Sequence, residues 1–143
     1  MGSTTSAKPA WTLSPPSAYD IVAYWYPESE KVTTPGPRLR PSLVTQVLRG
    51  EGTGAIACRV VFGTKTLKII NRGSIDLIVQ DPRDLSQLGL PRPTRFDLDR
   101  VLTLPWEPPF FGCWAGYPTP KIGSLTETYI REYAWLMHKR SSV

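Results

Sequence analysis

The stretch GPRLRPSLV, residues 36–44, is the most informative part of the chain for both fold and function. Two arginines, Arg38 and Arg40, lie between a Pro/Gly-rich loop and an apolar run that predicts a strand over residues 42–48. Because side chains alternate along an extended backbone, both arginines are expected on the same side of it. Two guanidinium groups at a loop-to-strand junction can hold a phosphate in a fixed geometry. The alternative is that both are ordinary solvated arginines.

Further strands are predicted on either side of this stretch by runs of aromatic and β-branched residues. These runs cover residues 19–26, 55–62, 74–79 and 94–104. Between Pro105 and Pro120 the sequence predicts irregular structure, although the aromatic residues there can either fill the core or form a patch for a partner. The fold class is therefore mainly β with added helices, a small curled antiparallel sheet or barrel.

Two helices are expected. A short one is inserted after the strand at residues 74–79, where Asp81 can cap its start, Pro82 can occupy its first position and Gly89 can end it. A longer helix is expected at the C-terminal end, opened by the capping box Ser124–Glu127 and continuing to about Arg140.

Length and composition limit the possible classes of protein. The 143 residues suit one domain, which we expect over residues 18–143, after a flexible tail at residues 1–17. Fifteen prolines disfavour long helices over most of the chain. The net charge of +5 is compatible with nucleic acid or an acidic protein as partner. No apolar stretch is long enough for a membrane span and no secretory signal is visible, so we expect a cytoplasmic protein with no membrane association.

The cysteines and the histidine do not form a metal-binding pattern. Cys58 and Cys113 are far apart in sequence, and His138 is the single histidine. Because a zinc site needs about four closely spaced ligands, no metal site is expected, and both cysteines are expected to be free thiols.

Short motifs give the chain a resemblance to a known family. Asp20-Ile-Val22 opens the first predicted strand, Arg40-Pro41 precedes the second, and Phe62-Gly-Thr64 ends the third. With these motifs the chain resembles the PemK/MazF family of bacterial toxins over about residues 18–106. That family opens with a glycine where this chain has Tyr19.

The resemblance implies a small SH3-like β-barrel with helical additions, which usually forms a two-fold homodimer. It also implies a toxin-like, metal-independent endoribonuclease that cleaves single-stranded RNA, needs no cofactor and is neutralised by an antitoxin. A relative with the same fold inhibits DNA gyrase instead, so the fold alone does not fix the function.

Candidate site residues follow from these motifs. Arg40 is expected to clamp the phosphate and stabilise charge on it, while the resemblance assigns Thr64 a hydrogen bond to a phosphate oxygen. Arg38 and Lys65 are expected to bind the RNA. Tyr24 is expected to stack on a base, because three consecutive aromatic residues in a strand must send at least one ring outward. Core packing is the alternative for that ring.

A group that transfers protons is harder to identify. Asp20 can instead cap a turn, Glu28 and Glu30 can be solvated loop charges, and His138 can be an ordinary residue at a helix C-terminus. Two hypotheses therefore remain open: the endoribonuclease, and a non-catalytic binding or inhibitor protein on the same fold that acts through a protein partner. An unrelated small β-domain that matches the motifs by chance is a third.

Overall fold

The computed structural model describes residues 8–26, 38–67 and 75–141. Its regular elements are a short 3-10 helix (Ala10–Leu13), β1 (Asp20–Tyr26), β2 (Arg38–Arg49), β3 (Ile56–Thr64), β4 (Leu77–Val79), α1 (Pro82–Leu88), β5 (Thr94–Pro105), β6 (Lys121–Ser124) and α2 (Glu127–Ser141). No helix among the described residues is long and apolar enough to cross a membrane.

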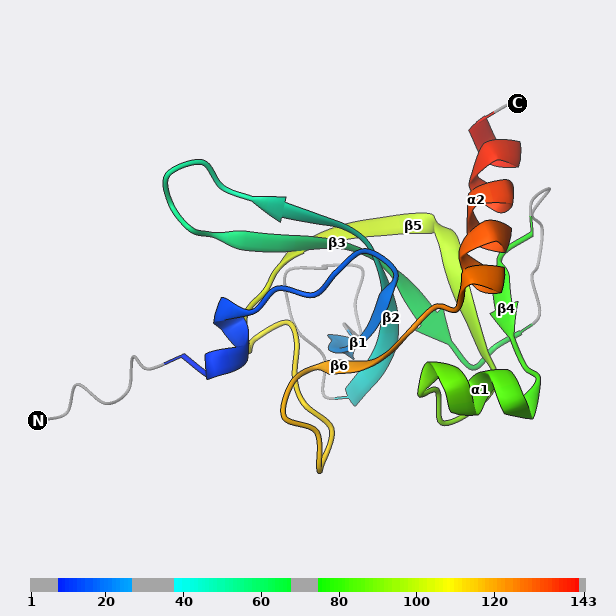
Figure 1. The fold of residues 1–143 in the computed structure, drawn as a ribbon, viewed down its shortest axis with the longest axis horizontal. Helices are drawn as coiled ribbons and strands as arrows, with labels where there is room; N and C mark the ends of the chain where they lie inside the picture. The colour runs from blue at the N-terminus through cyan, green and yellow to red at the C-terminus, as the bar shows by residue number, and fades with distance from the viewer. Residues whose placement is uncertain (1–7, 27–37, 68–74, 142–143) are drawn as a thin grey trace, which may run out of the picture.

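The strands form one six-stranded sheet in the order β4-β5-β3-β2-β1-β6, and every neighbouring pair is antiparallel. The sheet curls into a half-barrel, with α1 and α2 near one end beside β4 (Figure 1). The expected class, mainly β with added helices, is confirmed. Three register shifts accompany the curling: one in β1 between Ile21 and Val22, one in β2 between Val44 and Gln46, and one in β3 between Val61 and Gly63.

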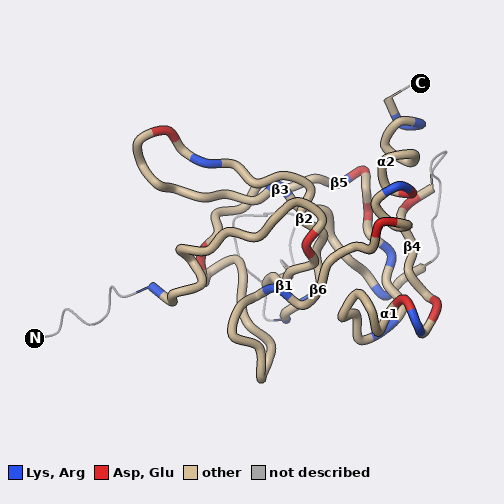
Figure 2. Tube along the Cα trace, in the orientation of Figure 1, with Lys and Arg blue, Asp and Glu red and all other residues tan. Residues whose placement is uncertain are grey.

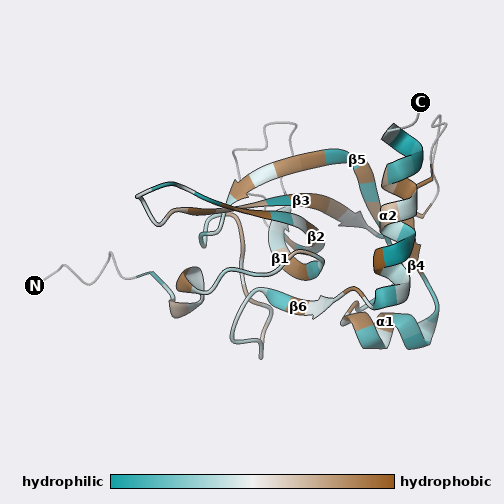
Figure 3. Ribbon diagram, turned by 45° about the horizontal axis from the view of Figure 1, so that its top comes forward, coloured by the Kyte–Doolittle hydropathy of each residue, from teal (hydrophilic) through white to brown (hydrophobic). Residues whose placement is uncertain are grey.

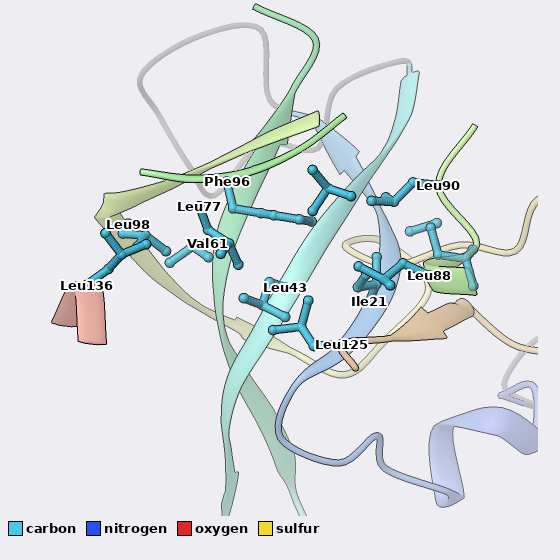
Figure 4. Close-up of a cluster of buried hydrophobic side chains, with 13 residues drawn as sticks. Ile21, Leu43, Val61, Leu77, Leu88, Leu90, Phe96, Leu98, Leu125 and Leu136 are labelled. Carbon is cyan, nitrogen blue, oxygen red and sulfur yellow. The ribbon is translucent and has the colours of Figure 1, made fainter. Parts of the chain in front are cut away.

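Alternation along the strands produces two hydrophobic cores, one for each face of the sheet. On β1, Ile21 and Ala23 join the core that α1 and α2 cover, whereas Val22 and Tyr24 join the other. Figure 4 shows the first core, in which side chains from β1, β2, β3, β5 and both helices meet. Hydrophobic positions concentrate in the central strands (Figure 3).

The second core includes the N-terminal segment that composition predicts to be a flexible tail. Trp11, in the 3-10 helix, is buried, and its ring centroid lies 4.9 Å from that of Trp106 in an edge-to-face contact. The indole nitrogen of Trp106 also donates to the carbonyl oxygens of Trp11 at 3.0 Å and of Ser14 at 3.2 Å. The segment is therefore packed against the sheet from Ala10 onward. The aromatic run after Pro105 supplies part of this core through Trp106 and Phe111.

Helix α1 is built as its sequence predicts. The Asp81 carboxylate accepts a hydrogen bond from the backbone N–H of Arg83 at 2.9 Å, and Gly89 ends the helix with a φ of 74°.

The capping box expected at α2 is wrong. Ser124 belongs to β6, and its hydroxyl donates to Asp20 at 2.8 Å instead of capping a helix that begins at Glu127. β6 itself was not predicted, because a four-residue strand of sequence KIGS carries almost no β pattern and depends on its pairing with β1.

The residue before β1 has an unusual backbone. Tyr19 has a φ of 73°, and it is the one described non-glycine residue in the left-handed region. Its amide donates to the carbonyl oxygen of Val44 at 2.7 Å, and its carbonyl oxygen accepts from Leu125 at 2.9 Å. These two bonds to distant segments hold Tyr19 in a conformation that glycine adopts far more easily.

Near β4 and α2 a buried carboxylate, two partly buried arginines and an exposed aspartate lie together, and we call Asp76, Arg95, Asp99 and Arg140 the charge cluster. Asp76 is 1% exposed, and its carboxylate accepts from Arg95 at 2.6 Å and from Arg140 at 2.9 Å. Arg140 also pairs with Asp99 at 2.9 Å. Figure 2 shows basic and acidic positions interleaved around α1, β4 and α2. The cluster joins the end of α2 to the edge of the sheet.

Candidate nucleic-acid interface

The end of the sheet that carries Arg38 and Arg40 opens into a cleft. β2 and β3 are paired from Arg49–Ile56 to Ser42–Phe62. Beyond Ser42, β2 continues with β1 as its partner, while Gly63 and Thr64 of β3 pair with β5. A cavity of about 230 Å³ lies at this divergence. It is lined by Arg38, Leu39, Arg40, Pro41, Gly63, Thr64, Lys65, Pro91, Arg92, Thr94 and Trp114, and we call it the cationic cleft.

Gly63 of β3 allows the backbones of β2 and β3 to lie close together at the point beyond which they separate. A Cβ placed on Gly63 would lie 2.7 Å from the carbonyl oxygen of Pro41 and 3.0 Å from Cγ2 of Thr94. Any other residue would force the strands apart, so this position requires a glycine, and the spacing between the cleft walls is set by backbone rather than by flexible side chains.

Four basic residues line the cleft: Arg38, Arg40, Lys65 and Arg92. Arg38, Lys65 and Arg92 are exposed and Arg40 is half-buried. None of the described residues that line the cleft is acidic. With positive charge on its walls and no carboxylate among its described lining residues, the cleft is suited to attract an anion.

Arg40 is held against an aromatic ring. Its guanidinium carbon lies 4.3 Å from the centroid of Tyr26, a cation–π contact. The register places Arg40 opposite Tyr24 and Arg38 opposite Tyr26, so both arginines lie on one side of β2, as alternation predicts. Both belong to the strand itself, which begins four residues earlier than the sequence indicates.

Thr64 ends β3, as predicted, and its hydroxyl is oriented by a local turn. The hydroxyl oxygen accepts a hydrogen bond from the backbone N–H of Thr66 at 3.2 Å. A hydroxyl that accepts one bond still has its hydrogen to donate. The turn is tied to the charge cluster, because Nε of Arg95 donates to the carbonyl oxygen of Thr66 at 2.8 Å.

Tyr24 is placed differently from the expectation. Its side chain is fully buried, stacked on Phe62 at a centroid distance of 4.8 Å, so it offers no surface to a base. The sequence could not tell which of Tyr24, Trp25 and Tyr26 turns outward. Tyr26, at the strand end, is the partly exposed ring on this side.

The Tyr24 hydroxyl is buried and has no hydrogen-bond partner in the part of the chain that is described. Burial, assisted by Tyr26, raises its pKa above the usual range, while the nearby Arg40 and Arg100 act in the opposite direction. The phenol therefore stays neutral at physiological pH and is not a general base.

The candidate proton-transfer groups lie away from the cleft. Asp20 caps a turn: its carboxylate accepts from the amide of Ser17 and the hydroxyl of Ser124, both at 2.8 Å. It is at the opposite end of β1 from Tyr26, and six strand residues span roughly 20 Å. His138 is in the last turn of α2 and does not line the cleft. Glu28 and Glu30 lie outside the described residues.

The structure adds residues that sequence reasoning did not select. Arg92 joins the cleft from the segment before β5, Thr94 from the first position of β5, and Trp114 from the segment between β5 and β6. The sequence Pro91-Arg-Pro93 contained a signal for Arg92, because flanking prolines stiffen the backbone around a basic residue. Trp114 gave no such signal, since its place depends on how the segment after Pro105 packs.

No protein-family model and no curated protein matches this chain.

Proposed function

We propose that this protein binds single-stranded RNA in the cationic cleft and cleaves it without a metal ion, as a divergent member of the PemK/MazF toxin family. The observation that carries the proposal is the convergence of Arg38, Arg40, Thr64 and Lys65 in one cavity, where no described lining residue is acidic. These four residues come from two strand ends that the sequence alone does not bring together. Basic side chains with a hydroxyl donor are the groups that phosphate oxygens bind.

Two features of the backbone support the family assignment. Tyr19 stands where the family has its opening glycine, and its φ of 73° is the conformation for which a glycine is suited. The curled antiparallel sheet, with a helix inserted before β5, is compatible with an SH3-like barrel.

The chemistry assigned to the cleft is transesterification at phosphorus. The ribose 2′-hydroxyl loses its proton to solvent as its oxygen attacks the phosphorus, and the bond to the 5′-oxygen breaks as that oxygen takes up a proton from solvent. The products are a 2′,3′-cyclic phosphate and a free 5′-hydroxyl. Arg40 stabilises the negative charge that grows on the non-bridging oxygens, and Thr64 donates a hydrogen bond to one of them. The pKa of an arginine exceeds about 12, so Arg40 acts through its charge and not as a base.

The absence of a carboxylate or imidazole from the described cleft lining favours a second candidate. Acid–base groups typically contribute about 10²–10⁴-fold to a rate, so a site without them is poorly equipped for turnover. The second candidate is a non-catalytic protein on the same fold, which uses the cleft to bind and acts on a protein partner.

One experiment separates the two. The purified protein is incubated in EDTA with a mixed-sequence single-stranded RNA, and the products are resolved on a denaturing gel. Cleavage by the parent protein that falls at least 100-fold in Arg40→Ala and about 10-fold in Thr64→Val supports the endoribonuclease. The control is Arg131→Ala, which removes an exposed arginine of α2 that pairs with Glu127 and lies outside the cleft.

RNA that is bound but stays intact in every sequence context would reject the nuclease and support the binding module. RNA that is neither bound nor cut would reject both candidates. Cleavage that persists in Arg40→Ala would show that a contaminating or different site is responsible.

The family assignment also implies that the protein forms a two-fold homodimer and binds an antitoxin, and both are part of the proposal. Light scattering coupled to size exclusion measures the first directly: a mass near 32 kDa, twice that of the 16.0 kDa chain, is expected. A mass of one chain at micromolar concentration would contradict it.

A further inference from the structure

A second concavity adjoins the cationic cleft and differs from it in chemistry. It has a volume of about 300 Å³ and is lined by Gly89, Leu90, Pro91, Trp114 and Tyr117, which we call the aromatic pocket. Pro91 and Trp114 line both cavities, so the two are neighbours. The cleft offers positive charge, whereas none of the residues that line the aromatic pocket is charged.

A tight turn builds the aromatic wall of this pocket. The amide of Tyr117 donates to the carbonyl oxygen of Trp114 at 2.9 Å, and Gly116, the third residue of the turn, has a φ of 89°. A turn with a positive φ at this position is one that glycine enters without steric cost. It brings the rings of Trp114 and Tyr117 together, with centroids 6.4 Å apart and planes at 63°.

The two rings differ in how they are held. Trp114 is partly buried and packs against the core beneath α1 and α2, so its position is fixed by the fold. Tyr117 is 42% exposed, which is unusual for a large ring and leaves a face available. A fixed ring, an exposed ring and Pro91 therefore surround a space at the small end of the range for ligand sites.

We propose that the aromatic pocket holds one nucleobase of a single-stranded RNA whose phosphates lie in the cationic cleft. This inference rests on the proposed function, because it takes the occupant of the cleft to be a polynucleotide. Proteins that bind single strands combine a basic groove for the backbone with aromatic rings on which bases stack. Pro91 and Trp114, which line both cavities, place these two parts side by side.

The lining also indicates how the base is bound. Its side chains present ring faces and aliphatic surface, apart from the Tyr117 hydroxyl and the indole N–H of Trp114. Stacking then contributes most of the affinity, and stacking is tolerant of base identity. The pocket is expected to favour a base over no base far more strongly than one base over another.

The test compares two oligomers of equal charge. One is an eight-nucleotide 2′-O-methyl RNA of mixed sequence, which resists cleavage through the 2′-oxygen. The other has the same backbone without bases. Dissociation constants are measured by fluorescence anisotropy for the parent protein, Tyr117→Ala, Tyr117→Phe and Arg92→Ala. Trp135→Ala is the matched control, since Trp135 is an exposed ring on α2 that lines neither cavity.

We expect Tyr117→Ala to weaken binding of the base-containing oligomer by about 5- to 150-fold and to leave the abasic oligomer unchanged. Tyr117→Phe keeps the ring and should retain the affinity, as should Trp135→Ala. Arg92→Ala should weaken both oligomers. Equal affinity of Tyr117→Ala and the parent protein for the base-containing oligomer would overturn the inference while leaving the cleft proposal standing. A parent protein that binds neither oligomer would overturn the proposed function itself.

Discussion

Arginine has opposite roles in the charge cluster and in the cationic cleft. In the cluster, Arg95 and Arg140 are only 12% and 13% exposed and both contact the buried carboxylate of Asp76. In the cleft, Arg38 and Arg92 are exposed, Arg40 lies against a tyrosine ring, and no described lining residue is acidic. The arginines of the cluster are paired with carboxylates within the fold. The arginines of the cleft have no carboxylate among the described lining residues and can attract an anion from solution.

The difference shows what makes an arginine a candidate for function. Charge and exposure alone do not distinguish the two groups, because Arg40 is itself half-buried. The distinction is whether a carboxylate lies within reach. A paired guanidinium has exchanged its water for a fixed partner, whereas an unneutralised one retains the electrostatic potential that draws in phosphate.

The largest effect is expected from breaking the cluster. Asp76→Asn keeps the size of the side chain but leaves two partly buried guanidinium groups without their shared carboxylate, so it should lower the free energy of unfolding by about 3–5 kcal/mol. Urea denaturation followed by circular dichroism measures the change.

Glu127→Gln is the control for this variant, because it removes the carboxylate of an exposed pair with Arg131 and should cost no more than about 0.5 kcal/mol. If Asp76→Asn and Glu127→Gln lower the free energy of unfolding by similar amounts, the charge cluster stabilises the fold no more than an exposed ion pair does.

An intermediate effect is expected in the cleft. Arg40→Ala should weaken binding of the uncleavable RNA by about 10- to 150-fold, the range for a hydrogen bond to a charged group. Unfolding free energy should change little, in contrast to Asp76→Asn. The plot of log affinity against log salt concentration should also become shallower by about 0.7, the value for one phosphate contact on a single strand.

A salt dependence identical in Arg40→Ala and the parent protein would mean that Arg40 does not contact phosphate. The Arg131→Ala variant provides the baseline, since it removes the same charge from outside the cleft.

The smallest effect concerns the ring beneath Arg40. Tyr26→Leu removes the cation–π contact but leaves the charge, so it should weaken RNA binding by about 2- to 5-fold, corresponding to about 0.5–1 kcal/mol. In a double-mutant cycle with Arg40→Ala, the Tyr26 change should have almost no further effect. Additive effects would show that Tyr26 acts independently, for example by contacting the RNA itself.

Much of the secondary structure could be predicted from the sequence. The strands around Asp20–Tyr26 and Thr94–Pro105 have strong β-branched and aromatic patterns, and α1 carries its cap, its proline and its terminal glycine in adjacent positions. The candidate site was predicted in part, since Arg40 and Thr64 follow from short motifs.

What could not be predicted depends on contacts between distant segments. β6 is recognisable only by its pairing with β1, and the burial of Tyr24 rather than Tyr26 depends on Phe62 and the core behind it. Arg92 and Arg95 lie three residues apart in a similar local sequence, yet one lines the cleft and the other belongs to the charge cluster. Their roles differ because of the partners that the folded chain supplies.

Arg95 links the charge cluster to the turn at Thr64–Thr66, and this link affects how the turn moves. Its Nη1 contacts Asp76 and its Nε holds the carbonyl oxygen of Thr66, whose amide in turn orients the Thr64 hydroxyl. Any local opening that separates Arg95 from Asp76 also weakens the hold on this turn. We therefore expect the Thr64–Thr66 turn to fluctuate with the slow opening of a buried ion cluster, not with the nanosecond motion of a surface loop. Faster amide hydrogen exchange at Thr66 in Asp76→Asn, measured under stable folding conditions, would reveal this link, and unchanged exchange would refute it.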